Sequence, residues 1–103
     1  MGTIKFKISG NTEFYIFKKS DFKKITVSYT SGSTGFLYVY FQAENNLINH
    51  DYMTLGVTKE YMEQVADRIV LLISKEGNDT IERVKQKSGL FNIKSITFTA
   101  GTA

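Results

Sequence analysis

The hydrophobic pattern of this chain changes its period once, near residue 58, and that change constrains the fold more than any other feature. Before it, apolar and polar residues alternate, which is typical of β-strands because successive side chains point to opposite faces. Polar, turn-forming segments divide this part of the chain. We therefore expect five strands, at 3–9, 13–18, 22–30, 36–43 and 52–57.

After residue 58 the apolar residues recur at helical spacing, at Met62, Val65, Ala66, Ile69, Leu72 and Ile73. Thr58 is the expected N-cap, and Gly77 is expected to stop the helix just after Lys75. This pattern predicts one amphipathic helix whose apolar side packs on the sheet.

The last third of the chain predicts a second, short helix and a final strand. Asp79 and Glu82 have the spacing of a capping box, which favours a helix from Asp79 to about Lys87. The strand is expected at 91–99, and its alternation breaks around Lys94 and Ser95, as at a β-bulge.

These elements predict a single α+β domain over residues 1–103. Strands joined by short turns are most easily antiparallel. We expect a strongly bent antiparallel sheet, or a small partly open barrel, of about five to six strands. The amphipathic helix and the short helix would cap it.

The residue inventory argues against catalysis. There is no cysteine, and His50 is the one histidine, which excludes thiolate chemistry and a multi-histidine metal centre. His50 is adjacent to Asp51, and neighbours in sequence do not easily form a triad-like pair. We expect no enzymatic activity, metal or cofactor. With no targeting signal and no apolar run long enough to span a bilayer, we expect a soluble protein, intracellular or virion-associated and not secreted.

Positive charge is concentrated at the N-terminal end. The chain has a formal net charge of +3, and residues 1–24 hold six lysines against two acids. Two interpretations stay open: a patch that binds phosphates, or a lysine-rich sheet edge that resists aggregation. The lysines are Lys5, Lys7, Lys18, Lys19, Lys23 and Lys24.

An aromatic row is the strongest functional feature. Phe36, Tyr38 and Tyr40 share one face of an expected strand, opposite Leu37, Val39 and Phe41. Aromatic side chains on a sheet can stack with the bases of single-stranded nucleic acid. The same row could instead be core in a closed barrel, or be covered by a second subunit.

The strands and helix within residues 25–73 resemble the strand–strand–strand–helix core of small hypothetical proteins of marine tailed phages. The short, bent strands also resemble the Sm/Lsm-like small β-barrel, an RNA-binding fold. The Sm motifs are absent and the helix follows the strands, so no Sm binding residue is carried over. Residues 53–61 look like the last strand and helix entry of coactivator-type single-strand DNA-binding proteins.

We therefore predict a non-enzymatic, Sm-like nucleic-acid-binding β module for RNA or single-stranded DNA. It would use the six N-terminal lysines together with Phe36, Tyr38 and Tyr40. The alternative is a phage-type structural or assembly protein whose aromatic row forms an oligomer interface. In either case we expect a homo-oligomer, because the apolar surface exceeds what one helix can cover.

Overall fold

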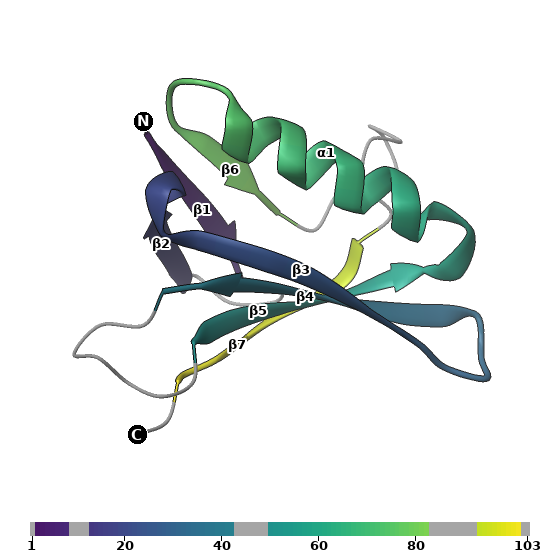
Figure 1. Ribbon diagram of the computed structural model, residues 1–103. Helices are drawn as coiled ribbons and strands as arrows, with labels where there is room; N and C mark the ends of the chain where they lie inside the picture. The colour runs from purple at the N-terminus through teal and green to yellow at the C-terminus, as the bar shows by residue number, and fades with distance from the viewer. Residues whose placement is uncertain (1, 9–12, 43–49, 83–92, 102–103) are drawn as a thin grey trace.

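The computed structural model of the chain describes residues 2–8, 13–42, 50–82 and 93–101 (Figure 1). These residues form seven strands in two sheets, one α-helix and two 3₁₀ turns. In chain order the elements are β1 (Thr3–Lys7), β2 (Phe14–Lys18), η1 (Lys19–Asp21), β3 (Phe22–Tyr29), β4 (Thr34–Phe41), β5 (Asp51–Thr58), η3 (Lys59–Tyr61), α1 (Met62–Ser74), β6 (Asp79–Ile81) and β7 (Ile93–Thr99).

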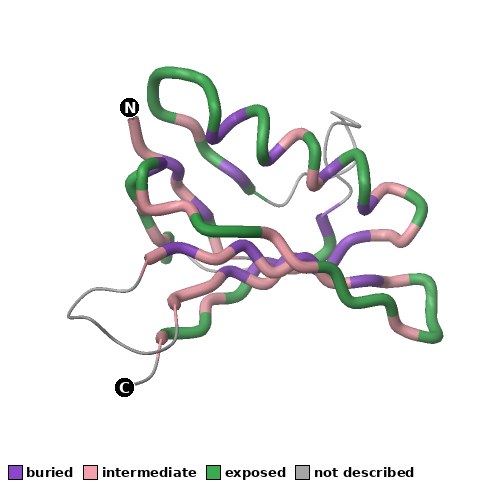
Figure 2. Tube along the Cα trace, in the orientation of Figure 1, coloured by how far each residue is buried: buried purple, intermediate pink, exposed green. Residues whose placement is uncertain are grey.

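The larger sheet is antiparallel, with the strand order β3-β4-β5-β7. Buried and half-buried residues alternate along β4, as the tube in Figure 2 shows. Leu37 and Val39 of β4 are buried opposite Leu55 and Met53 of β5, so one face of the sheet is an apolar inner face. The five expected strands are confirmed; their expected ends at residues 9 and 43 lie outside the described residues.

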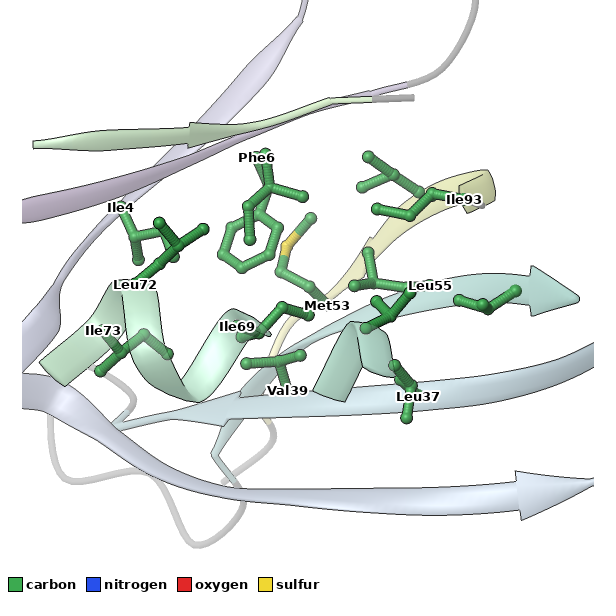
Figure 3. Close-up of a cluster of buried hydrophobic side chains, with 14 of the residues drawn as sticks. Ile4, Phe6, Leu37, Val39, Met53, Leu55, Ile69, Leu72, Ile73 and Ile93 are labelled. Carbon is green, nitrogen blue, oxygen red and sulfur yellow. The ribbon is translucent and has the colours of Figure 1, made fainter. Parts of the chain in front are cut away.

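Helix α1 covers this inner face, as its apolar spacing predicts. Met62, Val65, Ile69, Leu72 and Ile73 are all buried. Figure 3 labels Ile69, Leu72 and Ile73 among side chains of both sheets. The helix ends at Ser74, and Gly77 follows with φ +99°, a conformation that favours glycine.

The expected N-cap at Thr58 is wrong. The α-helix begins at Met62, because the turn η3 precedes it, and no hydrogen bond from the Thr58 side chain caps that turn.

The smaller sheet, in the order β2-β1-β6, encloses the core from another side. Ile4, Phe6 and Ile81 from this sheet are fully buried. The Phe17 ring of β2 stacks on Phe41 of β4 with 4.2 Å between ring centroids, and Phe6 meets the same ring edge-on. The core therefore lies between the larger sheet, α1 and the smaller sheet.

Two features of the predicted architecture change. Neither sheet closes into a barrel in the described part of the chain, so the Sm-like barrel of five to six strands is not confirmed. The position of a barrel's opposite wall is taken by α1 and the smaller sheet. The second change is that the sheets are not wholly antiparallel, because β6 runs parallel to β1.

The short helix expected from Asp79 is wrong over the residues that the structure describes. Residues 79–81 form β6, and residues 83–87 lie outside the described residues. The capping-box spacing is a local preference, whereas Ile81 is buried in the core and Asp79 pairs with Lys19. These distant contacts favour the strand over the helix.

Candidate nucleic-acid interface

The outer face of the larger sheet, opposite α1, carries the aromatic row. Phe36, Tyr38 and Tyr40 alternate along β4 with buried residues, and each is half-buried. Their expected position opposite Leu37, Val39 and Phe41 is confirmed by that alternation. No described element of the chain packs over this face as α1 packs over the inner face (Figure 1).

Tyr52 of β5 adds a fourth aromatic side chain to the row. It lies opposite Tyr40 in the strand register, and its ring centroid is 5.0 Å from that of Tyr40 and 5.8 Å from that of Tyr38. We call Phe36, Tyr38, Tyr40 and Tyr52 the aromatic face. Tyr52 was not among the predicted binding residues, although its alternation with Met53 placed it on the side away from the core.

Hydroxyl-bearing residues surround the aromatic face. Thr26 lies beside Tyr38 on β3, and Thr54 lies beside it on β5, followed by Thr97 on β7. Asp51 is the sole carboxylate in the four strands, and its register partner Phe41 places it on the inner side. The outer face of these strands therefore carries no carboxylate.

A β-bulge brings a lysine to one end of the aromatic face. The register of β3 against β4 shifts between Phe22 and Lys24, so Lys23 is an extra residue there. The Lys24 ammonium lies 5.0 Å from the Tyr40 ring centroid, over the ring. This cation–π contact holds a positive charge beside the aromatic face.

A second bulge brings a lysine to the other end. Ser95 lies opposite Gly56 and Ile93 opposite Val57, so Lys94 is the extra residue, which confirms the bulge predicted here. The Lys94 Nζ donates a hydrogen bond of 2.9 Å to Thr34, which lies two residues before Phe36 and so on the same face of β4. Lys94 was not among the predicted binding residues, although the broken alternation that revealed the bulge pointed to it.

Gly56 lies opposite both Phe36 and Ser95 at this end. A Cβ atom there would lie 2.5 Å from the Ser95 hydroxyl and 3.6 Å from the Phe36 ring, the second being an ordinary contact distance. Any larger residue would therefore collide with the Ser95 side chain.

The N-terminal lysines do not form one patch. Lys5, Lys7 and Lys18 belong to the smaller sheet, whereas Lys23 and Lys24 lie on β3. Lys5 lies over the Phe14 ring, with 4.6 Å from its ammonium to the ring centroid, and Lys7 pairs with Glu82 at 3.3 Å. The charge excess of residues 1–24 is thus divided between two sheets.

Lys19 is buried inside the protein and is not accessible to a ligand. Its side chain is fully buried, and its Nζ donates hydrogen bonds to the Asp79 carboxylate at 2.6 Å and to the Lys75 carbonyl at 3.0 Å. The hydrogen bond from Lys19 is the main cause that holds the pKa of Asp79 below its ordinary value of 3.8. Lys19 is therefore left out of the candidate interface.

The described residues offer little for other chemistry. They hold no group of three potential metal-ligating side chains, and no helix among them is long and apolar enough to cross a membrane. Asp51, the neighbour of His50, accepts a hydrogen bond of 2.6 Å from the Gly101 backbone N–H. An open cleft of about 550 Å³ lies along β2 and ends against Asp21, Gln42, Asp51 and Phe98. Comparisons with protein-family models, with curated proteins and with solved structures gave no match for this chain.

Proposed function

We propose that this chain is a non-enzymatic module that binds single-stranded RNA or DNA on the aromatic face. The observation that carries the proposal is the combination of four aromatic side chains on a sheet face that no described element covers with a lysine at each end, Lys24 and Lys94. Bases stack on aromatic rings whatever their sequence, and lysines neutralise phosphates. The absence of carboxylates from this face removes a source of repulsion.

The dimensions of the face suit a short stretch of single strand. Phe36 and Tyr40 are four residues apart on one strand, which corresponds to roughly 13 Å at about 3.3 Å per residue. Sheet modules of this kind stack about two or three bases on their aromatic side chains. Bases would lie over Tyr38 and its neighbours, with phosphates near Lys24 and Lys94.

Fluorescence anisotropy with labelled oligo-U and oligo-dT of about eight nucleotides tests the proposal. Tyr38→Ala should weaken binding by about 1–3 kcal/mol, because it removes one stacking platform. Tyr29→Ala is the matched control, since Tyr29 lies on β3 opposite Gly35 and so on the inner side of the same sheet, 66% exposed. Equal losses in the two variants would contradict the proposal, as would the absence of binding by the parent protein at ~50 mM salt.

The salt dependence tests the two lysines separately. Each neutralised phosphate contributes about −0.7 to the slope of log K against log salt for a single strand. Replacing Lys24 and Lys94 with glutamine should therefore make the slope shallower by about 1.4. Lys5→Gln with Lys18→Gln removes the same charge from the smaller sheet and should leave the slope unchanged.

One observation favours a second candidate, a phage-type structural or assembly protein. The aromatic face is apolar at its centre and half-buried within one chain, which also suits an interface between subunits. In that case Tyr38→Ala would change the molecular mass in solution and would not change oligonucleotide binding.

A further inference from the structure

Strand β2 is an edge strand of the smaller sheet in the part of the chain that the structure describes. In the described residues β2 pairs with β1 alone (Figure 1). Hydrogen bonds from Ile8 N–H to the Glu13 carbonyl and from Lys19 N–H to the Gly2 carbonyl, both 3.0 Å, fix which residues bond toward β1. Both bonds use odd-numbered residues on the β2 side, and the residues that bond to a given neighbour alternate along an antiparallel strand. The even-numbered residues of β2 therefore direct their N–H and C=O groups away from β1. These residues are Phe14, Ile16 and Lys18.

The other sheet edges in the described structure carry features that discourage pairing. Edge strand β3 is interrupted by the bulge at Lys23, and β7 by the bulge at Lys94. Strand β6 has three residues. Strand β3 also exposes Val27 and Tyr29, but β2 keeps an uninterrupted register with its partner over its whole length, with Phe14 47% and Ile16 54% exposed. Such an edge is a template for another strand.

Residues 15–18 of β2 also line the open cleft of about 550 Å³, together with Asp21, Gln42, Asp51 and Phe98. Within the described part of the chain, Ile16 and Lys18 therefore border this cleft.

We infer that β2 pairs with β2 of a second copy of this chain, antiparallel about a two-fold axis at Ile16. A strand can pair here only if its own outward backbone groups meet those of Phe14, Ile16 and Lys18. The register centred on Ile16 matches all three positions at once, and it keeps the two sheet faces continuous. The result is a six-stranded sheet across the dimer.

The side chains suit this register. Ile16 lies opposite Ile16 of the second copy, and Phe14 lies opposite Lys18 of the second copy. The pairing of Phe14 with Lys18 of the second copy is a lysine–aromatic contact of the same kind as the one that Lys5 and Phe14 make within one chain. A symmetric contact of this kind closes as a dimer and exposes no further copy of the same edge.

A cysteine at the symmetry centre tests the register, because the natural sequence has no cysteine. Hydrogen-bonded antiparallel pairs have Cα atoms about 5.5 Å apart, within the range of a disulfide. Ile16→Cys should give a disulfide-linked dimer on mild oxidation, seen on a non-reducing gel. Leu71→Cys on α1 is the control, since Leu71 is also 54% exposed, and it should cross-link much more slowly.

A proline at the same position tests the backbone contact. Ile16→Pro removes an N–H that points away from β1, so the β1–β2 ladder stays intact while the intermolecular hydrogen bonds are lost. Sedimentation velocity should show concentration-dependent dimers for the parent protein and monomer for Ile16→Pro, with an unchanged circular dichroism spectrum.

Three outcomes would overturn the inference. They are a parent protein that is monomeric at every concentration, an Ile16→Pro variant that still dimerises, and equal cross-linking rates for the two cysteine variants. None of these depends on nucleic-acid binding, because β2 takes no part in the aromatic face.

Discussion

The ion pair between Lys19 and Asp79 shows how one residue can look functional in sequence and be structural in the fold. Lys19 is the one buried charged residue among the residues that the structure describes. It links the turn after β2 to the start of β6, sixty positions away in the chain. Burying a charge is costly unless it is paired and hydrogen-bonded, and Asp79 with the Lys75 carbonyl provides both.

Asp79→Asn should lower the free energy of unfolding by about 3 kcal/mol at neutral pH, because the buried Lys19 ammonium loses its counter-charge. Adding Lys19→Met should recover much of the loss, since it removes the unpaired charge. Urea denaturation gives the free energy of unfolding of the parent, of Asp79→Asn and of the double variant. A single variant as stable as the parent would contradict the structural role of the pair.

The same pair sets the direction of the pH dependence. The pKa of Asp79 is lowered in the folded state, so its contribution is full above the ordinary value of 3.8 and is lost as the pH falls through the folded pKa. The stability difference between parent and Asp79→Asn should therefore shrink as the pH is lowered below 3.8.

At the scale of elements, α1 and β4 each present two different sides. The helix buries Ile69 and leaves Leu71 exposed, although both are large aliphatic residues two positions apart. Strand β4 buries Val39 and leaves Tyr38 and Tyr40 on its outer side. The position within the period, not hydrophobicity alone, decides which side chains enter the core.

Ile69→Asp should unfold the protein, whereas Leu71→Asp should leave its stability nearly unchanged. An unpaired buried charge at position 69 costs several kcal/mol, comparable with the roughly 5–15 kcal/mol that stabilises a domain. Thermal melts followed by circular dichroism compare the two. If Ile69→Asp melts at the same temperature as the parent, a different side of α1 must face the core.

At the scale of the whole molecule, two sheets separate the two proposed surfaces. The aromatic face belongs to the larger sheet, and the free edge of β2 belongs to the smaller one. They share no residue, so changes at one should add independently to changes at the other.

Ile16→Pro should therefore abolish dimerisation and leave the affinity for a short oligonucleotide within about twofold of the parent value, which corresponds to the ~0.3–0.5 kcal/mol expected for independent sites. Tyr38→Ala should do the reverse. Sedimentation velocity and anisotropy on both single variants and the double variant check this. A large loss of oligonucleotide binding in Ile16→Pro would show that the two surfaces are coupled.

The sequence by itself determined the features that depend on near neighbours in the chain. Strand alternation, the apolar stripe of α1 and the broken pattern at Lys94 are all visible within a few residues, and the structure confirms them. The same alternation placed Phe36, Tyr38 and Tyr40 opposite the core. It did not predict that Tyr52, Lys24 and Lys94 lie on one surface, because these residues come from three different strands.

Only the tertiary structure decided which segments meet. It made β6 a strand parallel to β1 where local spacing favoured a helix, because Ile81 is buried there and Asp79 neutralises Lys19. It also divided the N-terminal lysines among the core, the smaller sheet and the aromatic face. Contacts between residues sixty or more positions apart leave no periodic trace in the sequence, and burial and charge pairing across those distances outweigh a local helix cap.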